Sequence, residues 1–331
     1  MYIMDNEKES CRAAAANGGM HMKTVFIDGS AGTTGLRIHD RLAGRADVRL
    51  LTLPEAERKL PESRKRMLNE ADVAFLCLPD EAAIEAASWV ENPNTVVLDT
   101  STAHRTAPGW VYGFPELSAA QKEKIRQAKR IAVPGCHASG FIALVQPLVA
   151  AGIVGKDALL SCYSLTGYSG GGKKMITQYE DAARSGLLDA PRQYGLGQTH
   201  KHLKEMKAVT GLANEPVFCP VVSDFYSGMQ MTVPLFADWL QNGATAEDIK
   251  AVYKALYAGP VVTYTDTVDE GGFLSAAAQS GKDSMKIAVT GNDERILLLA
   301  VYDNLGKGAS GAAVECMDLV TGADETLGLE L

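Results

Sequence analysis

The apolar and polar positions of the first third of the chain alternate as short buried strands and helices do. An apolar run at 23–28 is followed by a glycine loop at 29–35 and then by a helical pattern. Further apolar runs predict strands at 48–53, 71–78 and 95–98, with a helix at 81–90. Strands that alternate with helices form a parallel sheet covered on both faces. This part is therefore predicted to be an α/β, Rossmann-type nucleotide-binding domain.

The pattern changes after residue 136, where only one or two helices separate the later strand-like runs. These runs lie at 159–166, 217–222, 229–235, 261–265, 285–290 and 295–302. Such an arrangement is typical of an α+β domain with a mixed or antiparallel sheet. We therefore expect residues 1–22 to be a disordered extension, 23–135 to form the first domain, and 136–304 the second. A helical segment within about 305–331 is expected to return to the first domain.

Composition excludes several classes of function. The 331 residues are 46% hydrophobic and 22% charged, with a formal net charge of -8, so no basic surface for nucleic acid is expected. No apolar run reaches the roughly 20 residues that a membrane span needs. The six cysteines are scattered without C-x-x-C spacing, which argues against a disulfide framework or a metal site and favours a reducing cytoplasm.

The loop 29–35 has the spacing G-x-x-G-x-x-G between a strand and a helix. Glycines there allow the backbone to approach a pyrophosphate, which the helix N-terminus then holds, although such a loop also occurs as a plain turn. An acidic residue about 20 positions further on would indicate NAD. Glu55 lies near that point, but so do Arg58 and Lys59, so the residues alone leave NAD and NADP open.

Cys136 follows a short apolar strand and a Pro-Gly turn, and it precedes a helical run. A cysteine in the first turn of a helix is favoured as thiolate by unpaired amides and by the helix dipole. A thiolate is a nucleophile that can form a covalent acyl intermediate. The alternative is a buried structural cysteine, since a free cysteine packs like a small hydrophobe.

Three polar segments can supply the remaining chemistry. The run 194–205 contains His200 and His202, which are candidates for a catalytic acid/base. They could instead bind zinc, but we find no third ligand at a suitable spacing. The loop 169–174 can bind phosphate through amides and lysines, or it is a mobile surface loop. Arg105 follows a strand end and can hold a carboxylate or phosphate, or form a surface ion pair.

Together these segments resemble the short (type 2) form of N-acetyl-gamma-glutamyl-phosphate reductase, from Lys23 onward. The segments that carry the resemblance are 29–35, 99–105, 112–117, 134–136, 167–174, 194–205 and 303–311. The resemblance implies reduction of a small acyl phosphate, N-acetyl-L-glutamyl 5-phosphate, to N-acetyl-L-glutamate 5-semialdehyde in arginine biosynthesis. It further implies NADP(H), a cysteine thioester, no metal, and a dimer or tetramer formed through the second domain.

The resemblance also implies roles for single residues. The nucleophile is Cys136, and His200 or His202 is the acid/base. The expected cofactor-binding residues are Gly29, Ser30, Ala31, Gly32, Thr33, Thr34, Gly35, Leu78, Pro79, Ser101, Ser169, Gly170, Asn304 and Gly308. The expected substrate-binding residues are Arg105, Ser139, Lys173, Tyr194 and Glu205. His137 receives no role, because this position often carries another residue in the family.

Two other functions fit parts of the pattern. Aspartate-semialdehyde dehydrogenase shares the architecture and the thiol chemistry, and differs in the semialdehyde that it accepts. A nucleotide sensor without catalysis would bind the cofactor but would not use the thiol of Cys136.

Overall fold

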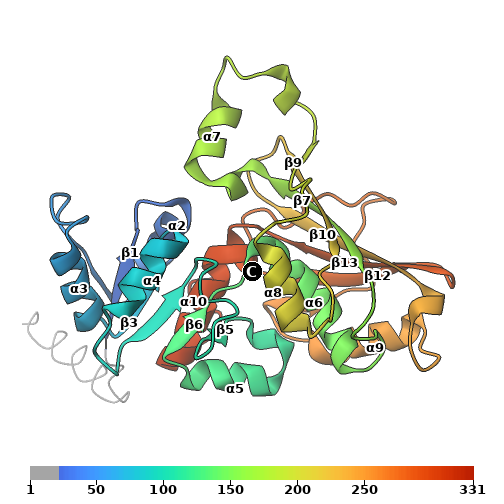
Figure 1. Cartoon of the computed structure of the whole chain (residues 1–331), viewed down its shortest axis with the longest axis horizontal. Helices are drawn as coiled ribbons and strands as arrows, with labels where there is room; N and C mark the ends of the chain where they lie inside the picture. The colour runs from blue at the N-terminus through green and yellow to red at the C-terminus, as the bar shows by residue number, and fades with distance from the viewer. Residues whose placement is uncertain (1–21) are drawn as a thin grey trace, which may run out of the picture.

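The computed structural model describes residues 22–331 and builds them around two β-sheets (Figure 1). The expectation of disorder for residues 1–22 lies outside the described residues, except for Met22. The first sheet is entirely parallel and has six strands in the order β2 (Val48–Leu51), β1 (Lys23–Asp28), β3 (Val73–Leu76), β4 (Val96–Asp99), β6 (Arg130–Ala132) and β5 (Val111–Tyr112). The predicted parallel sheet is confirmed.

Helices cover both faces of this sheet, so its central strands are shielded from solvent. β3 and β4 are fully buried along their length, as expected for parallel strands between helical layers. The helices are α2 (Thr33–Leu42), α3 (Pro61–Glu70), α4 (Asp80–Ser88) and α5 (Ala119–Gln127). The last helix, α10 (Gly311–Thr321), also packs here: Ala313, Val314 and Met317 share a buried cluster with Val25 and Ile38.

The second sheet is mixed and has seven strands. Their order is β11 (Val262–Tyr264), β12 (Met285–Gly291), β13 (Arg295–Tyr302), β10 (Met229–Phe236), β7 (Ser161–Gly167), β9 (Val217–Ser223) and β8 (Arg192–Gln193). Its helices are α6 (Cys136–Ala150), α7 (Gly172–Glu180), α8 (His202–Thr210) and α9 (Ala246–Leu256). The predicted α+β half is confirmed, and Figure 1 shows α7 projecting from it.

Helix α6 is the element that joins the two halves. It begins directly after β6 of the parallel sheet and packs on β10, β13 and α8 of the other half. Residues 137–145 are buried, and Phe141, Ile142 and Leu144 belong to the core of the mixed sheet. A helix that is buried on all sides over most of its length is held in place by its packing. Its first residue, Cys136, is therefore held at the boundary between the two sheets.

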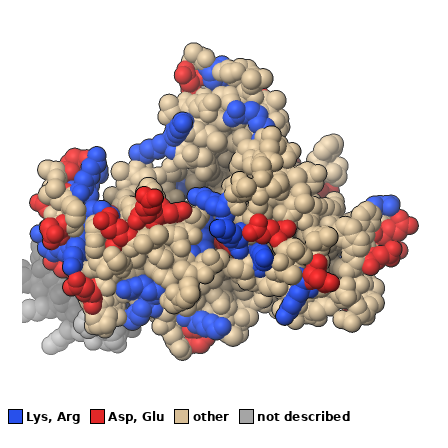
Figure 2. All heavy atoms as spheres, viewed as in Figure 1, with Lys and Arg blue, Asp and Glu red and all other residues tan. Residues whose placement is uncertain are grey.

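The visible surface carries Lys, Arg, Asp and Glu side chains close to one another, rather than a broad basic face (Figure 2). This mixture agrees with the formal net charge of -8. Within residues 22–331, no helix combines the length and the apolar character that a membrane crossing requires.

Candidate active site

Cys136 lies where the sequence places it, in the first turn of a helix. Gly135 is the extended N-cap residue of α6, and half-buried Cys136 lines a cavity of about 400 Å³ between the two halves. Burial nevertheless raises the pKa of Cys136 to about 11, although the nearby Arg105 guanidinium lowers it. The expected resting thiolate is therefore wrong for this geometry: loss of solvation outweighs the favourable amides and cation. The sulfur needs a base to become nucleophilic.

The cavity receives side chains from both halves of the chain. Thr34, Thr100 and Arg105 come from the parallel half, and Thr166, Met175 and Tyr194 from the mixed half. The other polar or glycine residues around it are Cys136, His137, Gly167, Gly170, Gly171, His200, Lys201, His202, Asn304 and Gly308. Gly308 lies so close that a Cβ there would be 3.0 Å from the Cβ of Cys136.

A buried ion pair fixes the backbone directly before the cysteine. Arg105 Nη1 is 3.0 Å from Glu205 Oε2, while Glu205 Oε1 accepts hydrogen bonds from the Gly135 amide and the Tyr112 hydroxyl, both at 2.7 Å. Arg105 also donates to the carbonyl oxygens of Val133 and Thr100. Hydrogen bonds of this kind satisfy the buried charges and rigidify the site. Glu205 is 2% exposed and does not line the cavity, so it acts on the site through Arg105 and Gly135.

His200 and His202 both line the cavity, with ring centroids 4.7 Å apart. His202 is buried, and a Cβ on Gly135 would lie 2.5 Å from its Nε2, so this ring faces the turn before Cys136. Burial lowers the pKa of His200, and burial together with Arg105 holds the pKa of His202 well below its ordinary value. Both rings are therefore neutral near pH 7 and able to accept a proton.

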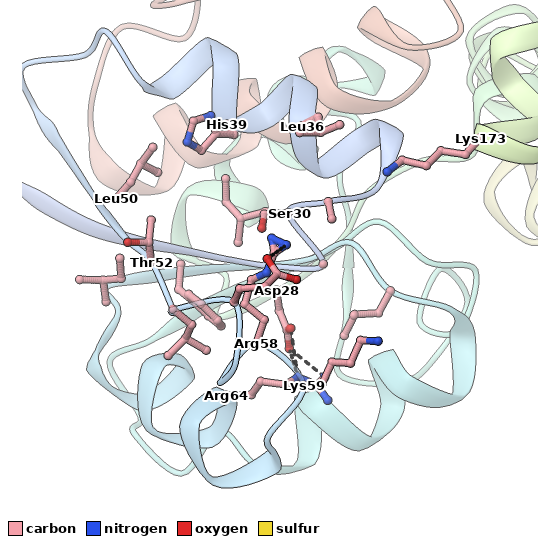
Figure 3. Close-up of a pocket in the computed structure, with 18 residues that line it drawn as sticks. Asp28, Ser30, Leu36, His39, Leu50, Thr52, Arg58, Lys59, Arg64 and Lys173 are labelled. Carbon is pink, nitrogen blue, oxygen red and sulfur yellow. Dashed lines mark hydrogen bonds and ion pairs between the residues drawn. The ribbon is translucent and has the colours of Figure 1, made fainter. Parts of the chain in front are cut away.

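The glycine loop begins a second cavity, of about 750 Å³, beside the first sheet (Figure 3). Gly29 has φ of +87°, and a Cβ there would overlap the carbonyl oxygen of Cys77, so only glycine fits. Gly29, Ser30 and Ala31 line this cavity, whereas Thr34 lines the cavity of Cys136. The N-terminus of α2 thus lies between the two cavities.

The far side of this second cavity is apolar with a basic margin. Leu36, Leu50 and Leu53 line it, and Arg58 and Lys59 lie at the loop after β2. In Figure 3, Arg64 and Asp28 face each other below the glycine loop, where their ion pair measures 2.9 Å. A cavity of this kind can hold the aromatic base of a nucleotide and an anionic group on the ribose of that nucleotide. A dinucleotide would reach from there past α2 to Cys136.

The structure distributes the predicted site residues unevenly. The cavity of Cys136 brings together Thr34, Arg105, Tyr194, Gly170, His200, His202, Asn304 and Gly308, and the second cavity contains Gly29, Ser30, Ala31, Leu78 and Lys173. Ser139 is 1% exposed and donates to the Gly135 carbonyl oxygen, so the structure does not bring it to either cavity. Lys173 reaches the second cavity from α7.

The remaining predicted cofactor-binding residues line neither cavity. Gly32 is the N-cap residue of α2, Thr33 and Gly35 lie in its first turn, and Pro79 is the N-cap residue of α4. Buried Ser101 donates to Asp99, and buried Ser169 accepts a hydrogen bond from Asn304.

Sequence reasoning assigned no site role to several residues that line these cavities. Among them are His137 and Lys201 at the cavity of Cys136, and Arg58 and Lys59 at the second cavity. The two basic residues after β2 were the detectable signal, since that position contacts the ribose in Rossmann folds. Among residues 22–331, His, Cys, Asp and Glu side chains form no group of three that could bind a metal ion.

Two family models together match most of the chain. One, described as "Semialdehyde dehydrogenase, NAD binding domain", matches residues 21–128, and the other, "Semialdehyde dehydrogenase, dimerisation domain", matches residues 136–304. The chain is 45% identical over 311 residues to N-acetyl-gamma-glutamyl-phosphate reductase 2 of Pseudomonas putida, covering 92% of this chain and 98% of the relative. It is 48% identical over 303 residues to N-acetyl-gamma-glutamyl-phosphate reductase of Rhizobium etli, covering 89% and 98%.

Solved structures of similar fold are more distant in sequence. Aspartate semialdehyde dehydrogenase II of Vibrio cholerae matches with a TM-score of 0.68 at 16% identity, over 91% of this chain and 98% of that chain. Aspartate semialdehyde dehydrogenase of Candida albicans, solved with NADP, matches with a TM-score of 0.62 at 16% identity, over 92% and 99%. At this identity the likeness shows the fold.

Proposed function

Because the chain belongs to the N-acetyl-gamma-glutamyl-phosphate reductase family, we propose that it reduces N-acetyl-L-glutamyl 5-phosphate to N-acetyl-L-glutamate 5-semialdehyde, with release of phosphate, in arginine biosynthesis. The observation that carries this function is the position of Cys136, at the N-terminus of α6 in a cavity that both halves of the chain line. Relatives at 44–48% identity carry this name, which favours the N-acetylated substrate over aspartate semialdehyde.

The cofactor is NADP(H), and the residues present fit it. Only glycine fits at position 29, and the loop leads into the N-terminus of α2, where unpaired amides can bind a pyrophosphate. Arg58 and Lys59 at the margin of the second cavity supply positive charge for a ribose 2′-phosphate. When bound, NADPH supplies the hydride that reduces the acyl group on Cys136.

The chain's own residues perform the acyl transfer. His200 or His202 takes the Cys136 proton, and the sulfur bonds to the acyl carbon while the bond from that carbon to the phosphate oxygen breaks. Arg105 and Lys201 line the cavity, and their positive charges would bind the phosphate group of the substrate. The thioester formed is then reduced, the carbon–sulfur bond breaks to release the aldehyde, and the sulfur recovers a proton from the histidine.

We further propose that the enzyme works in the cytoplasm as a dimer or tetramer, joined through the mixed sheet. The sheet face opposite α6 and α9 exposes Tyr163, Val217 and Leu297, of which Val217 is 57% exposed. Apolar side chains gathered on one sheet face are typical of a surface that is covered in an assembly. The dimerisation-domain family model over 136–304 supports an assembly formed through this half of the chain.

An assay in the reverse direction tests the reaction. The protein receives NADP⁺ and phosphate with either N-acetylglutamate 5-semialdehyde or aspartate semialdehyde, and NADPH formation is followed at 340 nm. We expect turnover with the first substrate and at most a trace with the second. In Cys136→Ser, turnover should disappear while NADPH binding persists. Equal turnover of aspartate semialdehyde would contradict the assigned substrate, and an active Cys136→Ser protein would contradict the mechanism.

A further inference from the structure

The imidazole of His137 is held between two hydroxyl groups. Its Nδ1 is 2.6 Å from Ser164 Oγ on β7, and its Nε2 is 2.6 Å from Tyr194 Oη in the segment after β8. The ring also meets the edge of Phe218, with centroids 5.2 Å apart. His137 is 3% exposed, so two hydrogen bonds and packing fix the plane of its ring.

The protonation state of this ring determines whether each hydroxyl donates or accepts a hydrogen bond. Burial, together with neighbouring His200, lowers the pKa of His137 to about 3, so the ring is neutral at physiological pH. A neutral imidazole carries a hydrogen on one nitrogen and accepts at the other. One of the two hydroxyls must therefore donate to His137 while the other accepts from it.

The hydroxyl of Ser164 selects one of these two arrangements. Ser164 is fully buried, and within residues 22–331 its hydroxyl has no hydrogen-bond partner other than His137 Nδ1. If that nitrogen carried the hydrogen, the serine proton would be buried without an acceptor, which is costly. Ser164 therefore donates to Nδ1, and the hydrogen of His137 lies on Nε2 and is donated to Tyr194 Oη.

This arrangement leaves the proton of the Tyr194 hydroxyl available. Tyr194 lines the same cavity as Cys136, and its oxygen has no described protein partner other than His137. Burial raises the pKa of Tyr194, so its hydroxyl keeps its proton near pH 7. A fixed donor beside the nucleophile is in the position to serve the oxygen on which charge develops during acyl transfer.

We propose that His137 is a positioning residue: it orients the Tyr194 hydroxyl so that this hydroxyl donates a hydrogen bond to the acyl oxygen of the substrate on Cys136. The inference rests on the acyl-phosphate reduction proposed above. It adds a donor to that reaction and gives a role to a histidine that sequence reasoning left without one. The donor is oriented before the substrate arrives, so no reorganisation is needed when the acyl oxygen becomes negative.

A pair of substitutions separates the two hydrogen bonds of His137. In His137→Asn the amide reaches the place of Nδ1 and can still bond Ser164, but it does not reach Tyr194. In His137→Gln the longer side chain places its amide near Nε2, where it can still donate to Tyr194. Both variants lose ring packing against Phe218, so thermal unfolding and NADPH binding serve as matched controls for the fold.

The expected result is a graded loss of kcat with little change in KM. Tyr194→Phe should lower kcat about 100-fold, the loss seen when one donor to a developing oxyanion is removed. His137→Asn should lower kcat about 10-fold or more, and His137→Gln should keep kcat within about fivefold of the wild type, because the donor remains in place. The double variant His137→Asn/Tyr194→Phe should be no slower than Tyr194→Phe alone, because both changes remove the same interaction.

Two results would overturn the inference. One is a His137→Asn change that lowers kcat by the same factor in the wild type and in Tyr194→Phe, which would show that His137 acts independently of the Tyr194 hydroxyl. The other is a Tyr194→Phe effect confined to KM for the acyl phosphate and, in reverse, for phosphate, which would place the hydroxyl on the phosphate instead. If the wild type turns over a different acyl phosphate, the proposed function fails, and the same cycle measured with that substrate still tests the role of His137.

Discussion

At the scale of single residues, the site depends on groups that polar contacts hold in place. Arg105 and Glu205 are 100 positions apart in the chain, yet their ion pair and the Glu205 contact to the Gly135 amide fix the turn that presents Cys136. Removing one partner of such a pair would leave the other charge buried and alone. Cys136 itself is less solvated than a helix N-terminus suggests, and this difference can be measured.

Alkylation of Cys136 should depend on pH in a defined way. Because burial raises the pKa of this thiol to about 11, its thiolate is scarce at pH 7 and grows as pH rises. The rate of iodoacetamide reaction at Cys136 in the ligand-free protein should therefore increase about tenfold per pH unit from pH 7 until it levels near the pKa. Mass spectrometry of the Cys136 peptide measures it, with Cys136→Ser as the control for other cysteines. A rate that is already level below pH 8 would show that Arg105 and the amides of α6 lower the pKa of Cys136 by more than burial raises it.

At the scale of elements, the sequence predicted strands well and solvent-facing helices poorly. The predicted runs 23–28 and 295–302 have the same first and last residues as β1 and β13, and the bounds of the other confirmed strands differ by a few residues. Helices α3 and α5 were not predicted, because α3 buries only Ser63, Met67 and Leu68, and α5 only Ile125. Without an apolar stripe, the helical period does not appear in the sequence.

The candidate site was likewise predictable only in part. Local signals placed Cys136 on its helix and the glycine loop before α2, because neighbouring residues determine both features. The partnership of His137 with Ser164 and Tyr194, and that of Arg105 with Glu205, joins segments far apart in the chain. Only the tertiary fold brings these side chains together, so no spacing in the sequence could reveal them. The pKa of Cys136 likewise depends on burial by residues from both halves.

Replacing Gly29, in the turn between β1 and α2, should weaken both the fold and NADPH binding. Gly29→Ala must either strain a backbone with φ of +87° or push away the Cys77 carbonyl. A side chain in this conformation costs roughly 1–2 kcal/mol, and shifted loop amides would weaken pyrophosphate binding. We expect a lower melting temperature and NADPH affinity about tenfold weaker, which is what 1.4 kcal/mol corresponds to. Fluorescence titration measures the affinity.

Gly44→Ala is the matched control for this change. A Cβ at Gly44 meets open space, and its φ is not in the left-handed region, so both quantities should stay near the wild type. Wild-type NADPH affinity in a folded Gly29→Ala protein would contradict the proposed position of the pyrophosphate.

At the scale of the whole molecule, the two halves meet where the chain returns from the mixed sheet to the parallel one. After β13 the chain forms a π-helical turn, Gly306–Ser310, and continues into α10. Lys307 in this turn is 2% exposed, and its Nζ lies 2.7 Å from Glu116 Oε1 and 2.5 Å from Glu315 Oε2. It also lies over the ring of Phe114, 4.9 Å from the centroid. One buried cation thus joins segments of the parallel half to the turn that places Gly308 against Cys136.

Lys307→Met should therefore destabilise the whole molecule rather than one helix. It leaves two carboxylates facing each other with little water, and loss of one partner of a buried ion pair typically costs about 3–5 kcal/mol in the free energy of unfolding. Denaturant titration measures this loss. Lys250→Met, which breaks an exposed pair with Glu247, is the control and should change little. The double variant Lys307→Met/Glu315→Gln should recover part of the loss, because it removes one of the unpaired carboxylates. Equal destabilisation by the Lys307 and Lys250 changes would show that the buried cluster does not hold the halves together.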